Sequence, residues 1–159
     1  MNSEEYVINV FAAENWHGRK YFPWLREMLD RQEPVWHEVA RYYKDKPKEK
    51  EKEWRIIRCT TEMVLVLSQI IYWNLPDAAG QTRLRVIKEG ETWLAKSATE
   101  WAQECGITVR SAREAVSRLE LFGLIRLNTL HYRGHPTNHI ILDIDALARM
   151  VYAYRNPVA

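Results

Sequence analysis

The chain has 159 residues, of which 47% are hydrophobic and 28% are charged, and its formal net charge is +2. This composition excludes an intrinsically disordered chain, and the length suits one domain, or one small domain with an appended segment. The charge is too small to indicate a nucleic-acid-binding protein, so any basic surface has to come from the placement of arginine and lysine.

The sequence indicates neither secretion nor membrane insertion. The N-terminal stretch MNSEEYVINVFAAEN is acidic where a signal peptide needs a basic region. The longest apolar window, MVLVLSQIIYW, is about half as long as the ~20 residues that span a bilayer. Cys59 and Cys105 form no CxxC pair, which fits a reduced interior. We expect a cytoplasmic protein with no membrane partner, no cofactor and no metal.

The first part of the chain is rich in tryptophan and tyrosine, and we expect it to be helical. Pro23 and Pro34 stand at plausible first helical positions, and the apolar residues that follow each of them recur at helical spacing. The pattern predicts helices over 23–32 and 34–45. His17 and His37 have no acid or nucleophile arranged beside them, so neither is expected to be catalytic.

Alternating lysine and glutamate residues surround Pro47. The stretch from 44 to 55 fits either a solvated linker or the exposed first turns of a helix. Proline breaks a helix that enters from its N-terminal side, which favours the linker. We therefore divide the chain into an N-terminal helical extension, residues 1–58, and a second domain, residues 59–159.

Aromatic side chains of the extension are candidates for a homodimer interface, because aromatic residues dominate the buried cores of protein interfaces. The alternative is that the extension folds back on the second domain as a structural layer. The candidate interface residues are Trp24, Trp36, Tyr42 and Tyr43.

The second domain is expected to open with a largely buried helix. Thr60 or Thr61 is a candidate N-cap, and apolar residues on most faces predict a helix over 60–74. After a turn that contains proline and glycine, alternating patterns predict short strands over 82–87 and 92–96.

Two helices joined by a short turn come next. Ser97 and Glu100 form an S-x-x-E capping box for the first helix, and Gly106 is suited to end it. Thr108 can cap the second helix, which is predicted over 109–122 because its apolar residues form one stripe. Two helices joined in this way form a helix-turn-helix arrangement.

The polar face of the second helix carries small and arginine side chains. Small residues let a helix backbone approach the floor of a DNA major groove, and a guanidinium can bond two guanine acceptors at once. The same arginines can instead be solvated and paired with Glu114 or Glu120. The polar face consists of Arg110, Ser111, Arg113, Glu114, Ser117 and Arg118.

A long hairpin is predicted after the second helix. Gly123 can end that helix, and alternating patterns predict strands over 124–128 and 138–143. The stretch between them has Arg133 and Gly134 at its tip, where an arginine can reach a phosphate or the adjacent minor groove.

The chain is expected to end in a helix over 146–155, capped by Asp143 or Asp145. Three histidines precede this helix at four-residue steps, but a hairpin does not direct such a spacing to one point, and no cysteine or carboxylate cluster joins them. They are therefore not expected to bind metal. They are His131, His135 and His139.

The expected order of helix, strand, helix, helix, strand, wing and strand is that of winged-helix domains. The stretch GITVRSAREAVSRLELFGLIRL resembles the helix-turn-helix core of bacterial winged-helix proteins. Together with LVLSQIIYW and HPTNHIILDIDAL, it looks like the winged-helix proteins of phages, plasmids and integrative elements, which are related to replication initiators and DnaD-type replisome organisers. The resemblance covers residues 63–147.

The resemblance implies an α+β fold, mostly α: a winged helix-turn-helix domain with an N-terminal helical extension. It also implies sequence-specific binding of double-stranded DNA, in replication initiation or in transcriptional control of a mobile element or phage. Arg110 and Arg113 are the candidates for base edges, and Arg118 is the candidate for backbone phosphate. The full set of implied DNA contacts is Lys96, Thr99, Thr108, Arg110, Ser111, Arg113, Ser117, Arg118 and Arg133.

A second hypothesis makes the protein an adaptor whose winged helix docks a replication or transcription protein in place of DNA. An enzyme is not expected, because the sequence contains no GxxxxGK[ST], HExxH or GxSxG motif and no paired carboxylates with a matching base. We therefore expect a DNA-binding homodimer without catalytic residues.

Overall fold

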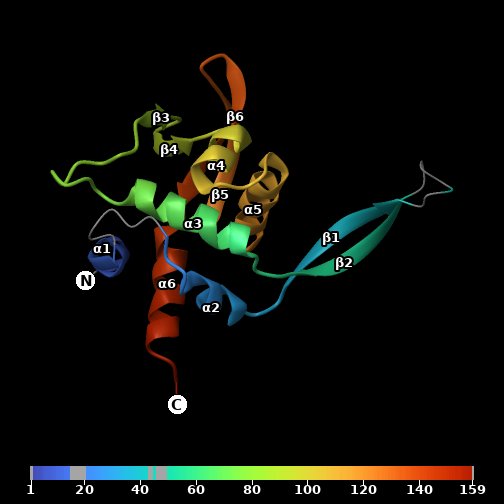
Figure 1. The fold of residues 1–159 in the computed structure, drawn as a ribbon, viewed down its shortest axis with the longest axis horizontal. Helices are drawn as coiled ribbons and strands as arrows, with labels where there is room; N and C mark the ends of the chain where they lie inside the picture. Colours follow the sequence, from blue (N-terminus) through green and yellow to red (C-terminus); the bar gives the residue numbers. More distant parts are fainter. Residues whose placement is uncertain (1, 15–20, 43–44, 46–49, 159) are drawn as a thin grey trace.

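The computed structural model describes residues 2–14, 21–42, 45 and 50–158. Helices and antiparallel strands both contribute, so the fold class is α+β as expected. Along the chain the elements are α1 (Ser3–Glu14), α2 (Leu25–Asp30), β1 (Val35–Tyr42), β2 (Lys50–Ile57), α3 (Thr61–Asn74), β3 (Val86–Lys88), β4 (Glu91–Ala95), α4 (Ala98–Cys105), α5 (Val109–Leu121), β5 (Ile125–Tyr132), β6 (His135–Leu142) and α6 (Ile144–Arg155) (Figure 1).

Helix α3 lies at the centre of the core. Thr60 caps it by accepting a hydrogen bond from the Met63 N–H at 3.3 Å, as the sequence predicts. Most of its side chains are buried, and it packs against α2, α4 and α5. Among the described residues no helix is both long enough and apolar enough to cross a membrane.

The strands form two separate sheets. β1 and β2 pair only with each other, whereas the second sheet has the antiparallel order β3-β4-β6-β5. β5 and β6 pair from Ile125↔Leu142 to Tyr132↔His135, so the expected bridge over 129–137 is almost all strand. The turn is Arg133 and Gly134, with φ of 51° and 81°. Such a two-residue turn needs positive φ at both positions, which glycine adopts without strain.

The N-terminal helices fold back as a layer on the rest of the chain, which was the alternative to a dimer interface. α1 packs along α6, and α2 contacts α3 and α6 (Figure 1). Phe11 and Phe22 are fully buried in the same apolar cluster as α3. Trp24 stacks between Phe11 and Tyr154, with ring centroids 5.3 and 5.7 Å apart. The layer is therefore continuous with the core.

The helix predicted over 34–45 is wrong, because Val35–Tyr42 is strand β1. The linker predicted over 44–55 is also wrong where it is described, because Lys50–Ile57 is strand β2. The two strands satisfy each other's backbone groups in the register Val35↔Ile57 to Tyr42↔Lys50. Valine, tryptophan and tyrosine favour strands, and a short apolar run does not separate strand from helix by spacing alone. Tyr43 and residues 44 and 46–49 of the expected linker lie outside the described residues.

The predicted strand over 82–87 is shorter than expected, since only Val86–Lys88 pairs with β4. Arg83 instead turns back to α3, where its guanidinium donates to the carbonyl oxygens of Tyr72 and Leu75 at 3.1 and 3.0 Å. The strand predicted over 92–96 is confirmed as β4 within one residue at each end.

Removing the Phe11 side chain tests whether the N-terminal layer is part of the core. We expect Phe11→Ala to lower the free energy of unfolding by about 3–5 kcal/mol, because it leaves a cavity among fully buried side chains. Urea denaturation followed by circular dichroism measures the change. The control Val158→Ala, at a 99% exposed position, is expected to leave stability unchanged; an equally small effect of Phe11→Ala would contradict the packing.

Candidate nucleic-acid interface

Local capping residues set where α4 and α5 begin and end. The Ser97 hydroxyl and the Glu100 carboxylate form the predicted capping box at the start of α4. Gly106 ends α4 with φ of 68°, in the left-handed region that glycine favours. After one further residue, Thr108 caps α5 by accepting from the Ser111 N–H at 3.1 Å. These signals end one helix and begin the next within three residues.

Helix α5 separates an apolar face from a polar one. Ala112, Ala115, Val116 and Leu119 are buried against the core, as the predicted stripe requires. The opposite face is exposed, and the Arg110 side chain is 90% accessible. Arg113 and Ser117 are exposed on the same helix, and Arg118 is half-buried. The helix therefore presents three arginines and small polar side chains outward.

These arginines are only weakly neutralised by their neighbours. Arg110 pairs with Glu114 at 3.2 Å, but both side chains are exposed, and such a pair contributes only a few tenths of a kcal/mol. Glu120 does not pair with an arginine; its carboxylate accepts the Leu127 N–H at 3.2 Å. Within the described part of the chain, Arg113 and Arg118 have no ion pair.

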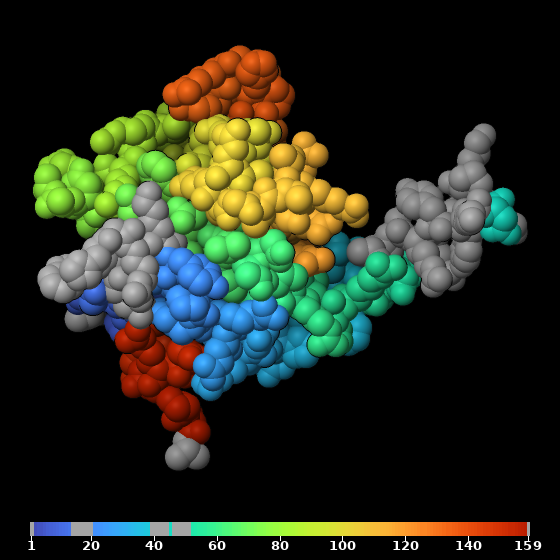
Figure 2. Space-filling model, in the orientation of Figure 1, coloured from blue at the N-terminus to red at the C-terminus, as the bar shows by residue number. Residues whose placement is uncertain are grey.

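Two hairpins project from the body on either side of α5 in Figure 1. The β5–β6 hairpin ends in Arg133, which is exposed and lies 5.1 Å from the centre of the Tyr132 ring. The β1–β2 hairpin leaves the body at another side, and Figure 2 shows β2 standing out from it. An elongated ligand lying along α5 could contact both hairpins.

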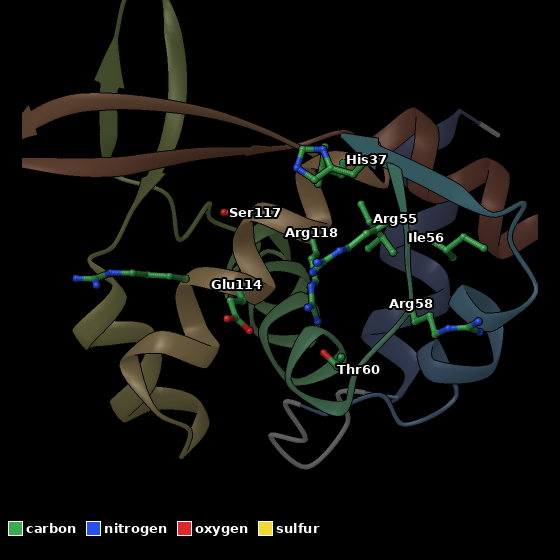
Figure 3. Close-up of a pocket in the computed structure, with 11 residues that line it drawn as sticks. His37, Arg55, Ile56, Arg58, Thr60, Glu114, Ser117 and Arg118 are labelled. Atoms are coloured by element: carbon green, nitrogen blue, oxygen red, sulfur yellow. The ribbon is translucent and has the colours of Figure 1, made fainter. Parts of the chain in front are cut away.

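The base of the β1–β2 hairpin and the side of α5 enclose a groove of about 550 Å³. Arg55 and Arg118 point toward one another across it in Figure 3, whereas Arg58 points away from α5. The sequence did not predict Arg55, Arg58 and His37 as part of an interface, because Arg55 was placed in a linker and His37 in a helix. The lining residues are His37, Arg55, Ile56, Ile57, Arg58, Thr60, Arg113, Glu114, Ser117, Arg118 and Leu121.

Lys96, which the sequence predicted as a phosphate contact, is held in a structural ion pair and does not line this groove. Its ammonium forms an ion pair with Glu104, and the two side chains are only 14% and 18% exposed. The same ammonium lies 4.2 Å from the centre of the Trp73 ring, whose indole N–H donates to Glu104 at 2.7 Å. Thr99 is exposed in the first turn of α4.

The candidate interface aromatics are divided by the structure. Trp24 is half-buried and stacked between Phe11 and Tyr154 in the N-terminal layer. Trp36 is 56% exposed, and on the same face of the hairpin Trp54 and Ile56 are 61% and 37% exposed. The Tyr42 side chain and the whole of Tyr43 lie outside the described residues.

In the part of the chain that the structure describes, neither the histidines nor the cysteines form a metal-binding cluster. His139 is buried between strands, with Nε2 3.2 Å from the Lys88 ammonium, whereas His131 and His135 are exposed. The described residues contain no group of three side chains that could hold a metal ion. Burial raises the pKa of both Cys59 and Cys105 from 9.0 to about 11, which disfavours the nucleophilic thiolate.

Comparison of the chain with protein-family models, with curated proteins and with solved structures finds no match. The functional assignment therefore depends on the geometry and charge of this surface.

Lys96 and Arg110 offer a matched test of buried against exposed cations. We expect Lys96→Ala to lower the free energy of unfolding by about 1–3 kcal/mol, because it leaves the half-buried Glu104 carboxylate without its cation. Arg110→Ala should change stability by less than about 0.5 kcal/mol, since its ion pair is exposed. Urea denaturation measures both, and equal effects would show that the ion pair of Lys96 is not structural.

Proposed function

We propose that the chain is a winged helix-turn-helix protein that binds double-stranded DNA, with α5 as the recognition helix and the β5–β6 hairpin as the wing. The observation that carries this proposal is the outer face of α5. It presents Arg110, Arg113 and the half-buried Arg118 beside small hydroxyl side chains, and among the described residues the one ion pair on this face is the exposed pair Arg110–Glu114. Clustered positive charge on one exposed face raises the local concentration of polyanions and so supports this assignment.

The geometry suits a helix seated in the major groove. Ser111 and Ser117 keep the surface low, so the α5 backbone can approach the base edges. Arg110 and Arg113 then reach guanine acceptors, and each bidentate contact contributes about 1–3 kcal/mol of discrimination against a wrong base pair. Arg133 at the tip of the wing adds a contact to the phosphate backbone or the neighbouring minor groove.

The biological process follows from the resemblance to winged-helix proteins of phages, plasmids and integrative elements. We place the protein in replication initiation or in transcriptional control of such an element. The adaptor function, in which the winged helix docks a partner protein, predicts binding that does not require Arg110 and Arg113.

Fluorescence anisotropy on random duplex DNA across a salt series tests this proposal. We expect the wild type to bind with a steep loss of affinity as salt rises, because phosphate contacts release counterions. Arg110→Ala/Arg113→Ala should lower affinity by at least about tenfold at low salt, since two charge-assisted contacts are lost.

The control Arg149→Ala removes an exposed arginine from α6, on a different face of the molecule. It should bind like the wild type. Equal binding by the double variant and this control would assign the α5 face to solvent or to a protein partner. Failure of the wild type to bind any duplex would remove DNA binding altogether.

We also propose that the chain forms a homodimer through the apolar face of the β1–β2 hairpin. A two-stranded hairpin is marginally stable alone in water, and this one exposes Trp36, Trp54 and Ile56 on a single face. Glu38 and Lys52 on that face pair at 3.3 Å, so these two charges offset each other where two copies meet. A two-fold axis brings the same face of each copy together.

Sedimentation velocity tests this interface. We expect Trp36→Ser/Trp54→Ser to shift a dimeric wild type toward the monomer, because the shared apolar area is lost. The control Tyr152→Ser changes an aromatic side chain on α6 that is 60% exposed and should leave the mass unchanged. A wild type that stays monomeric at high micromolar concentration would contradict the dimer.

A further inference from the structure

The groove between α5 and the β1–β2 hairpin brings positive charge together from two separate parts of the chain. Arg113 and Arg118 come from α5, and Arg55 and Arg58 come from the end of β2 and the residue after it. Four arginines contribute atoms to the lining, although the Arg58 side chain points away from α5, and Glu114 is the only carboxylate among the described lining residues. That carboxylate is already paired with Arg110 on the open side of the helix.

An anion bound between the two guanidinium groups that face each other across the groove would offset their mutual repulsion. Arg55 and Arg118 point toward one another in Figure 3, and like charges that converge raise the free energy of the unliganded protein. Arg55 is also bonded to Glu53 at 3.2 Å, but this contact is exposed and is weakened by solvent. A planar guanidinium is the side chain best suited to bind phosphate oxygens in pairs.

The position of the groove indicates which phosphate it would meet. A helix seated in the major groove, which is about 12 Å wide, has a sugar-phosphate backbone along each of its flanks. Arg118 lies on the flank of α5 that faces the hairpin, and His37 and Arg55 lie on the hairpin face turned toward α5. A backbone on this flank would run between α5 and β2.

We propose that the base of the β1–β2 hairpin is a second DNA-binding element, in which Arg55 and Arg118 bind a phosphate of the backbone that flanks the recognition helix. This inference rests on the proposed DNA-binding function. It assigns a role to a segment outside the helix-turn-helix and the wing. The base of the hairpin, here called the arm, would contact the backbone of one DNA strand while α5 contacts the base edges.

Arg55→Gln isolates this contact, because the Arg55 side chain is 60% exposed and its removal should not affect folding. Binding to two duplexes of unrelated sequence is measured by anisotropy across a salt series. We expect affinity to fall by about tenfold on both duplexes, and the slope of log K against log salt to fall by about one, because one phosphate contact is lost.

Three further measurements sharpen the result. Arg149→Gln removes the same charge from α6 and should keep the wild-type slope. Arg55→Lys keeps the charge and should also keep the slope, while it loses the paired hydrogen bonds. Ethylation interference should lose signal in Arg55→Gln at a phosphate next to the α5 footprint, with the rest of the footprint intact.

The outcomes separate this inference from the function on which it rests. If Arg55→Gln binds like Arg149→Gln while Arg110→Ala/Arg113→Ala loses binding, the DNA-binding function stands and the arm is overturned. If Arg55→Gln weakens only one of the two duplexes, Arg55 reads a base and the phosphate assignment is wrong. If the wild type binds neither duplex, the proposed function fails and the arm fails with it. Thermal unfolding of each variant checks that the fold is retained.

Discussion

The burial of α3 on almost every face is the constraint on which the rest of the structure depends. Its side chains contact α2, α4 and α5, and the buried Ser68 hydroxyl accepts the Phe22 N–H at 3.1 Å, which fixes the N-terminal layer to it. The alanine, valine and leucine side chains of α5 pack against α3, so the opposite face of α5 is polar and exposed. The direction of the arginines is thus a consequence of core packing.

Positive charge is concentrated at one groove of this protein, although the net charge is small. The chain as a whole is close to neutral, with a formal charge of +2. Two acidic residues near α5 make contacts away from its arginines: Glu104 pairs with Lys96, and Glu120 accepts a backbone hydrogen bond at the start of the β5–β6 hairpin. Glu114 pairs with Arg110 on the exposed side of α5. Arginines of α5 and β2 therefore contribute most of the charge of one groove, whereas Lys96 is bound in a structural ion pair. A local field of this kind attracts polyanions without a basic protein overall.

Features set by neighbouring residues were predictable from the sequence, and features set by distant partners were not. The caps at Thr60, Ser97, Thr108 and Asp143 need only residues three positions away, and the structure has all four. The valine and tryptophan residues of β1 also fit a helical spacing, so the sequence predicted a helix there, and that prediction was wrong. Strand β1 forms because it pairs with β2, which is a distant segment that the local pattern does not reveal. The structural role of Lys96 depends on Trp73, far away in sequence. The groove could not be predicted for the same reason, because it forms between α5 and β2, and β2 was predicted as a linker.

The two faces of the β1–β2 hairpin connect the proposals for DNA and for a second copy. One face carries Trp36, Trp54 and Ile56, and the other turns His37 and Arg55 toward α5. A hairpin of two strands gains stability when either face is covered. Covering the tryptophan face would order the arm and hold Arg55 at the groove, so DNA would find that contact already formed. If dimer formation raises the affinity for DNA in this way, thermodynamic linkage requires that DNA binding raises the affinity between two copies by the same factor. The hairpin would then couple assembly to DNA binding without any contact between the two ligands.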